Sequence, residues 1–340
     1  MRQAVTVSPK HIELQQADQC PAPGLGEVLL DIASVGICGS DYELWSGSDP
    51  YSRFPIRQGH EFSARISAGA DDYIGDFRVG QLVAVEPLLP DGTCFACRRG
   101  HPNCCSSLRV MGAHVDGALV DQLVVPLSNL YAVGQLSADL AAFVEPVSIG
   151  LQMVTRSGLE PGDQVVVFGA GPIGQAVQIV ASDRGARVAV VDVLPERLEL
   201  AKANGAERVV DASKSDPTEE LVPWTLGDGP AVAFEATGVA RVLQQAIDVV
   251  AHSGTVVIAG TTNDAVEIPT MTMVKKELNL LGSRNNARLY ADAVSMVQRH
   301  RERCDALITH RFSLERVQEA MEFGEANPRE ANKVVIRVSD

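Results

Sequence analysis

Four residues in the first half of the chain have side chains that could together hold a metal ion. Cys38 and the pair His60-Glu61 each lie at the end of a β-like run, and Glu145 lies further along the chain. A thiolate, an imidazole and a carboxylate suit Zn²⁺ with an open coordination position. Taken singly, such a cysteine is usually a core residue, such a histidine packed and such a glutamate solvated. Spacing alone leaves both interpretations open, and the glycine-rich loop described below favours catalysis.

A second group of candidate metal ligands is formed by cysteines that crowd into one short segment. Disulfide frameworks are typical of short secreted chains with paired cysteines, so an odd total of seven in a long chain indicates metal ligands instead. The pair Cys94-x-x-Cys97, followed by Cys105, predicts a compact structural zinc loop. A nucleic-acid-binding zinc ribbon is the competing interpretation. The net charge of −14 and the lack of interleaved aromatic residues disfavour it.

A glycine-rich loop fits the G-x-G-x-x-G fingerprint of dinucleotide sites at Gly169, Gly171 and Gly174. The first glycine allows a tight turn, the second lets a pyrophosphate approach the backbone, and the third lets helix and sheet pack closely. Asp192 ends the next predicted strand, where it would accept hydrogen bonds from a ribose and repel a 2′-phosphate. This favours NAD over NADP, although Arg197 could tolerate a phosphate. The alternative is a tight strand-to-helix turn that binds no ligand.

Two segments of the chain, with different patterns of apolar residues, must position these side chains. Residues 1–130 contain short β-like runs broken by Gly, Pro and Asp, which predicts a β-rich barrel or sandwich. From about residue 147, apolar strand runs alternate with amphipathic helical stretches, which predicts βαβ units and a parallel sheet. The alternation ends after residues 275–282, and a predicted strand over residues 333–338 closes the chain.

The composition excludes several classes of protein. With 340 residues, of which 46% are hydrophobic, the chain predicts about two domains. It has 43 acidic and 29 basic side chains and no basic block, which argues against nucleic acid and anionic membranes as partners. No apolar run reaches the roughly 18 residues of a membrane span, and the N-terminus does not resemble a signal peptide. We expect a soluble, cytoplasmic protein.

Taken in order, these motifs resemble the zinc-dependent medium-chain dehydrogenases, the superfamily of alcohol, sorbitol and threonine dehydrogenases. The resemblance covers essentially the whole chain. It implies an α/β fold, in which a Rossmann domain with a parallel sheet (148–282) is inserted into a β-rich, GroES-like catalytic domain (1–147 and 283–340). It also implies a homodimer or homotetramer formed by edge pairing of the nucleotide-binding sheets, acting on a small-molecule alcohol.

The resemblance assigns roles to individual residues. Cys38, His60 and either Glu61 or Glu145 would hold a catalytic zinc, and Ser40 would begin a proton relay. Relatives often have a histidine where this chain has Glu43, so the relay would run through Glu43 or directly to water. The alternative is that Glu43 is a surface carboxylate with no part in the relay. NAD would be bound by Gly169, Gly171, Pro172, Ile173, Gly174, Asp192, Arg197, Thr237 and Gly260.

The structural zinc loop departs from the family pattern. The family's first structural cysteine aligns with Asp91 in this chain. Aspartate can bind zinc, so Asp91, Cys94, Cys97 and Cys105 form a plausible set of ligands, with Cys104 as a substitute. Occupancy of this loop by metal is therefore an open question.

The substrate is predicted from the branch of the family that the chain resembles most. Several stretches look like the sugar-acid dehydrogenases, which oxidise aldonates of the L-galactonate or L-gulonate type at C5. A carboxylate substrate needs a cation, for which Arg284 is the first candidate and Arg109 or His114 are alternatives. Arg284 could instead bind the cofactor or a neighbouring carboxylate. The alternative substrate is a polyol such as sorbitol or galactitol, and the alternative classes are a zinc-free quinone reductase and a non-enzymatic NAD sensor.

Overall fold

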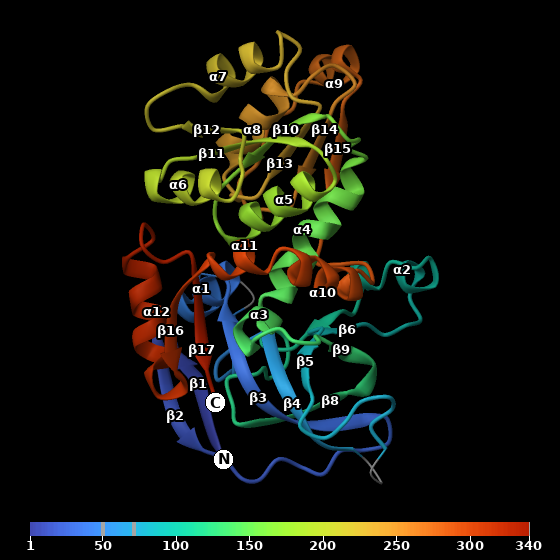
Figure 1. Ribbon diagram of the computed structural model, residues 1–340, viewed down its shortest axis with the longest axis vertical. Coiled ribbons are helices and arrows are strands. Elements are labelled where there is room, and N and C mark those ends of the chain that lie inside the picture. The colour runs from blue at the N-terminus through green and yellow to red at the C-terminus, as the bar shows by residue number, and fades with distance from the viewer. Residues whose placement is uncertain (49–51, 70–72, 340) are drawn as a thin grey trace. The chain divides into compact units, whose positions relative to one another are not determined.

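The computed structural model describes residues 1–48, 52–69 and 73–339, which form two compact units (Figure 1). Unit 1 comprises Met1–Glu145 and Tyr290–Asp340, and unit 2 comprises Pro146–Leu289. Each unit has a hydrophobic core of its own. None of the helices in the described ranges combines the length and the apolar character needed to cross a membrane.

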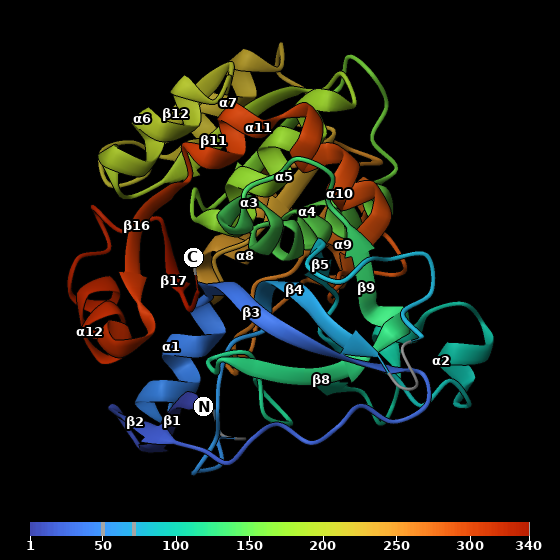
Figure 2. The same ribbon diagram turned by 60° about the horizontal axis from the view of Figure 1, so that its bottom comes forward.

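Unit 1 is built on a mainly antiparallel sheet with the strand order β16-β17-β3-β4-β5-β9, and β8 pairs with β3 outside this order. The strands are β3 (Glu27–Ile37), β4 (Glu61–Gly69), β5 (Leu82–Val85), β8 (Gln122–Pro126), β9 (Leu130–Ala132), β16 (Ile308–Ser313) and β17 (Lys333–Arg337). Figures 1 and 2 show the red strand β17 beside the blue strand β3, so the two ends of the chain share one sheet.

Smaller elements surround this sheet. Strands β1 (Arg2–Ser8) and β2 (His11–Gln16) form an antiparallel pair, as do β6 (Leu88–Leu89) and β7 (Arg109–Val110). The helices of unit 1 are α1 (Gly39–Ser46), α2 (Phe95–Arg98), α3 (Ala138–Ala142), α10 (Tyr290–Arg299), α11 (Arg301–Asp305) and α12 (Val317–Ala326). Helix α3 packs on β3, β4 and β5.

Unit 2 contains a six-stranded parallel sheet with the order β12-β11-β10-β13-β14-β15. Its strands are β10 (Gln164–Phe168), β11 (Arg187–Asp192), β12 (Arg208–Asp211), β13 (Val232–Glu235), β14 (Thr255–Ile258) and β15 (Asn279–Gly282). Strand β10 is buried continuously over residues 165–168, as expected of a strand covered on both faces. The strand order reverses between β10 and β13, and this is where open α/β sheets bind ligands.

Helices connect successive strands of the parallel sheet. They are α5 (Pro172–Asp183), α6 (Pro195–Ala203), α7 (Pro217–Trp224), α8 (Ala240–Val249) and α9 (Thr270–Lys276), and α4 (Val144–Ser157) leads into the unit. Helices α7 and α8 supply Leu221 and Ile247 to the core that contains Phe168. The predicted fold class, a Rossmann sheet combined with a β-rich domain, is therefore confirmed.

Candidate metal and dinucleotide sites

The sheet of unit 1 brings three of the predicted metal ligands together. Cys38 directly follows β3 and lies at the N-terminal cap of α1, and Glu61 begins β4, where it pairs with Gly36 of β3. His60 comes directly before β4. One ligand atom from each of Cys38, His60 and Glu61 lies within 4.8 Å of the other two. A thiol, a buried imidazole and a buried carboxylate at this spacing fit a zinc ion.

The carboxylate of Glu61 has a partner that the sequence did not indicate. Lys333, at the start of β17, donates from Nζ to the two Glu61 carboxylate oxygens at 2.7 and 2.6 Å and to the carbonyl of Ile37 at 2.9 Å. The side chains of Lys333 and Glu61 are 2% and 0% exposed. Burial lowers the pKa of Lys333, but the acidic groups around it, with Glu61 first, together outweigh this and the pKa is raised. The lysine that opens β17 carries no local signal for this pairing in the sequence.

Space for Glu61 depends on a glycine in the neighbouring strand. A Cβ atom at Gly36 would lie 2.2 Å from Oε2 of Glu61. No side chain of any size therefore fits at this position without displacing the carboxylate. Gly36 and Lys333 together fix where Glu61 lies.

The imidazole of His60 lies beside a second buried carboxylate, that of Asp41. Oδ2 of Asp41 accepts a hydrogen bond from the backbone N–H of Cys38 at 2.9 Å and lies 3.6 Å from Nδ1 of His60. Burial lowers the pKa of His60, but Asp41 and Cys38 together outweigh this, so the pKa is raised well above its ordinary value. With Nδ1 facing Asp41, Nε2 is the ring nitrogen left to bind a metal.

The remaining residues predicted for catalysis lie outside this three-residue group. Glu145, in the first turn of α4, is buried, and burial raises its pKa to about 7. Ser40 and Glu43 lie on α1 and are exposed. The proton relay through Ser40 and Glu43 stays a prediction.

The cysteine-rich segment also gathers a set of ligands. Asp91, Cys94, Cys97 and Cys105 each offer one atom within 4.8 Å of the others, whereas the exposed Cys104 is not in this group. The carboxylate of Asp91 accepts hydrogen bonds from the N–H groups of Thr93 and Cys94 at 2.7 and 2.9 Å. Backbone hydrogen bonds lower the pKa of Cys94 to about 6, which favours the thiolate form that binds metals.

The glycine-rich loop of unit 2 has the backbone geometry that its sequence predicts. Gly169 follows β10 and has a φ of +98°, a conformation that favours glycine. Gly171 caps α5, whose first residue is Pro172. A Cβ atom at Gly174 would lie 1.7 Å from the carbonyl oxygen of Gly169, so the helix can approach the loop only because residue 174 is a glycine.

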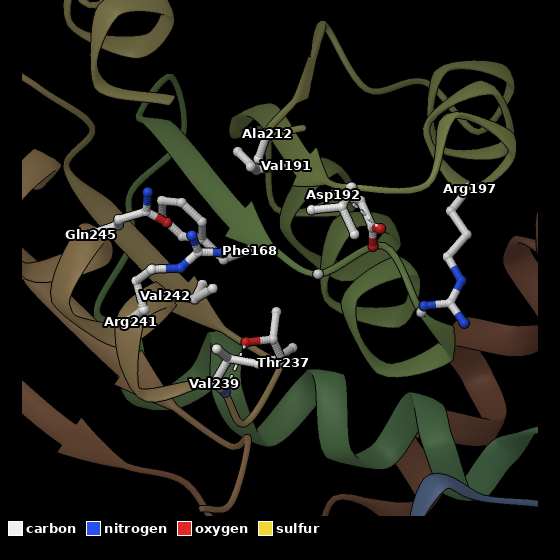
Figure 3. Close-up of a pocket in the computed structure, with 14 residues that line it drawn as sticks. Phe168, Val191, Asp192, Arg197, Ala212, Thr237, Val239, Arg241, Val242 and Gln245 are labelled. Carbon is white, nitrogen blue, oxygen red and sulfur yellow. Dashed lines mark hydrogen bonds between the residues drawn. The ribbon is translucent and has the colours of Figure 1, made fainter. Parts of the chain in front are cut away.

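A cavity of about 370 Å³ opens at this loop, at the point where the strand order reverses (Figure 3). The predicted cofactor residues that line it are Gly169, Gly171, Asp192, Arg197 and Thr237. Pro172, Ile173, Gly174 and Gly260 do not line it, and Gly260 packs against Gly238 instead. Sequence reasoning missed Arg241, Val242 and Gln245 of α8, which Figure 3 shows across the cavity from Asp192.

Asp192 is held in place by the backbone around it. Its Oδ2 accepts a hydrogen bond from the N–H of Ala170 at 2.7 Å, and its Oδ1 accepts from Val193 and Leu194 at 2.7 and 2.9 Å. These bonds tie the end of β11 to the glycine-rich loop after β10. The carboxylate is thereby fixed at the wall of the cavity, where a ribose could donate to it.

The three candidate cations for a substrate carboxylate belong neither to the group of Cys38, His60 and Glu61 nor to the lining of the cavity. Arg284 follows β15 in unit 2 and is exposed. Arg109 is exposed in β7, and His114 uses its Nδ1 to accept a hydrogen bond from the N–H of Val110 at 3.1 Å. Carboxylate binding by any of them stays a prediction.

Comparison with known proteins agrees with this arrangement. Residues 24–135 match the alcohol dehydrogenase GroES-like domain and residues 172–299 match the zinc-binding dehydrogenase domain. The chain is 33% identical over 337 residues to L-galactonate-5-dehydrogenase of Escherichia coli K12, covering 99% of this chain and 98% of that one. It is 30% identical over 345 residues to sorbitol dehydrogenase of Bacillus subtilis, covering 99% and 97%.

A solved structure is similar over the same extent. The alcohol dehydrogenase rspB of Escherichia coli CFT073, in complex with NADH, matches with a TM-score of 0.92 and 30% identity, covering 99% of each chain. The resemblance inferred from the motifs is thus confirmed. The chain belongs to the zinc-type medium-chain alcohol dehydrogenase family.

Proposed function

We propose that the protein is an NAD-dependent zinc dehydrogenase that oxidises a secondary alcohol of a sugar acid, of the L-galactonate or L-gulonate type, to the keto acid. Membership of the family makes it an oxidoreductase that acts on alcohol groups. The observation that carries the proposal is the grouping of Cys38, His60 and Glu61 within 4.8 Å. A zinc-free quinone reductase would have no use for this set, and neither would an NAD sensor.

The residues of unit 1 would hold the zinc and set its surroundings. Cys38, His60 and Glu61 would supply three ligand atoms, and the substrate hydroxyl would be the fourth. Bound zinc acts as a Lewis acid that lowers the pKa of such a hydroxyl. Lys333 holds the Glu61 carboxylate in place, so we assign Glu61 as the third ligand. Glu145 is the alternative ligand.

The cavity of unit 2 would hold the dinucleotide. The glycine-rich loop and the N-terminus of α5 offer backbone N–H groups to the pyrophosphate. The fixed carboxylate of Asp192 would accept hydrogen bonds from the ribose and disfavour a 2′-phosphate. NAD held in this cavity would supply the acceptor for the hydride of the alcohol. Arg197 and Arg241 also line the cavity, so some affinity for NADP is compatible with it.

The sugar-acid substrate rests on sequence similarity. L-galactonate-5-dehydrogenase shares 33% of its residues with this chain, and Arg284 is our candidate for binding the substrate carboxylate. A polyol is the second candidate, since sorbitol dehydrogenase of Bacillus subtilis is 30% identical over nearly the full chain. The two differ in one respect that can be tested, namely whether the substrate must carry a negative charge.

The test is NAD⁺ reduction by the purified protein with a panel of aldonates and neutral polyols, each with and without a zinc chelator. We expect turnover of an aldonate that the chelator abolishes and added Zn²⁺ restores. Turnover of neutral polyols alone would contradict the sugar-acid assignment and leave the zinc chemistry intact. Turnover that persists after zinc has been removed would contradict the proposed mechanism.

A further inference from the structure

A chain of three buried polar side chains leads away from Nδ1 of His60, and the proposed chemistry does not use them directly. Thr6 and Gln58 are each 1% exposed, and Asp41 is 4% exposed. They come from three separate segments, namely β1, the loop before β4, and α1. A buried polar group is costly unless it is hydrogen-bonded, so the partners of these three side chains matter.

The hydrogen bonds along these three side chains have a fixed direction. Nε2 of Gln58 donates to the backbone carbonyl oxygen of Asp41 at 2.9 Å and to its Oδ1 at 3.2 Å. A carboxylate only accepts, so the amide must present its NH₂ group to Asp41 and its oxygen to Thr6. The hydroxyl of Thr6 accordingly donates to Oε1 of Gln58 at 2.7 Å.

Both carboxylate oxygens of Asp41 therefore accept hydrogen bonds from other residues. Gln58 donates to Oδ1, and Oδ2 accepts from the N–H of Cys38 and faces Nδ1 of His60. The carboxylate cannot rotate without losing one of these donors. Its direction toward the imidazole is consequently set by Gln58 on one side and by Cys38 on the other.

The backbone of β1 supports the same region. Thr6 and Ile56 exchange two backbone hydrogen bonds, at 2.9 and 3.0 Å, so β1 holds the segment that leads to His60. Gly59, between Gln58 and His60, has a φ of +99° and leaves no room for a Cβ atom, which would lie 2.8 Å from Val35. The backbone bonds to β1 and the tight turn at Gly59 thus fix the course of this segment. This places the side chain of Gln58 beside that of Thr6.

We propose that Gln58 and Thr6 are positioning residues for the metal site: they orient the Asp41 carboxylate toward Nδ1 of His60, 3.6 Å away, which leaves Nε2 of the imidazole for the metal. This rests on the proposed function, because it supposes that His60 binds zinc. Partners of metal-binding histidines typically change metal affinity by 10- to 100-fold when removed. Gln58 acts one step further out, so the lower end of that range applies.

The test measures Zn²⁺ affinity by competition with a chromophoric chelator, and the absorption spectrum of the Co²⁺-substituted protein. Gln58→Met keeps the length of the side chain and removes the amide, and we expect about tenfold weaker binding and an altered Co²⁺ spectrum. Thr6→Val should weaken binding by a few-fold, whereas Thr6→Ser, which keeps the hydroxyl, should match the wild type. Cys38→Ala identifies which part of the zinc binding belongs to this site.

A buried amide in unit 2 provides the matched control. Gln178 of α5 is 0% exposed and donates to the carbonyl of Ala201 at 2.7 Å, so Gln178→Met also removes a buried amide. We expect it to leave Zn²⁺ affinity and the Co²⁺ spectrum unchanged. The proposal is overturned if folded Gln58→Met and Thr6→Val both bind Zn²⁺ as the wild type does. If Cys38→Ala removes no zinc binding, both the proposed function and this proposal fail.

Discussion

At the scale of single residues, the carboxylate of Glu61 is closely constrained by its neighbours. It is fully buried, takes hydrogen bonds from Lys333 on both oxygens, and still lies among the candidate metal ligands. A buried charge without a counter-charge is strongly destabilising. Lys333 therefore does more for stability than an ion pair at the surface would, and it does so from the far end of the chain.

Removing the counter-charge should be costly. We expect Lys333→Met to lower the free energy of unfolding by about 3–5 kcal/mol, because it leaves Glu61 buried and unpaired. The double variant Lys333→Met/Glu61→Gln should recover most of that loss, because no charge then remains to be compensated. Denaturant unfolding of the metal-free protein measures both. A loss of less than about 1 kcal/mol in the single variant would contradict this account.

The carboxylate of Asp192 allows a second prediction at this scale. We expect Asp192→Ser to weaken NAD⁺ binding by about 10- to 100-fold, since hydrogen bonds to a charged group are worth about 1.5–3 kcal/mol. Binding of NADP⁺ should weaken less, because a repulsive charge is removed at the same time. Calorimetric titration measures both affinities. Asp211→Ser is the control, because Asp211 ends the neighbouring strand β12 and does not line the cavity; equal losses for both variants would argue against the role of Asp192.

At the scale of elements, Asp139 ties one short helix to several strands of unit 1. Its carboxylate accepts hydrogen bonds from Ser34 of β3 at 2.8 Å and from Arg311 of β16 and Arg337 of β17 at 2.7 Å each. Burial alone would raise the pKa of Asp139, but these three donors outweigh it, and the pKa is lowered. The side chain of Asp139 is 5% exposed, whereas Arg311 and Arg337 are 32% and 55% exposed, so water weakens their contribution.

We expect Asp139→Asn to lower the free energy of unfolding by about 1–3 kcal/mol at neutral pH. Because the folded state lowers the pKa of Asp139, its contribution is complete above the unfolded value of about 3.9. It is lost as the pH falls from there through the lower folded value. The difference between wild type and variant should therefore shrink below about pH 4. Urea unfolding at several pH values measures it, and a difference independent of pH would rule out the charge as the cause.

The elements differ in how far the sequence could predict them. Strand β10 (Gln164–Phe168) could be predicted from the sequence, because a covered parallel strand is a continuous apolar run between turns. The motif glycines could be predicted too, because the contact that they permit is local: Gly169 and Gly174 meet within one loop and one helix turn. The pairing of β17 with β3, and with it the contact of Lys333 with Glu61, joins opposite ends of the chain, and no local pattern encodes it. Gln58 and Thr6 were missed likewise, because each is an ordinary polar residue until the fold brings them together.

At the scale of the whole molecule, unit 2 presents a sheet edge without a neighbouring strand within the described chain. Among the described residues, strand β15 pairs only with β14, and the adjoining helix α9 has no buried residue. Met271 and Val274 of α9 are 61% and 76% exposed. Unpaired strand edges are usually covered in native proteins. We propose that a second copy of the chain covers this edge.

This arrangement is tested by measuring molar mass with light scattering coupled to size-exclusion chromatography. We expect the wild type to elute as a dimer or a tetramer, and Met271→Glu/Val274→Glu to shift toward smaller species because two charges would be buried in the interface. Leu226→Glu is the control, since Leu226 is 93% exposed elsewhere in unit 2. A wild type that is monomeric at micromolar concentration would contradict the proposal.

The central claim is that the metal site of unit 1 performs the chemistry and the cavity of unit 2 binds the cofactor. The most direct measurement compares the wild type with His60→Ala for bound zinc, NADH affinity, and the rate of NAD⁺ reduction with the best alcohol of the panel. We predict that the variant loses zinc from this site and at least about 10³-fold in rate, as loss of several kcal/mol of Lewis-acid stabilisation implies, while NADH affinity is retained. Turnover by His60→Ala at the wild-type rate would contradict the account.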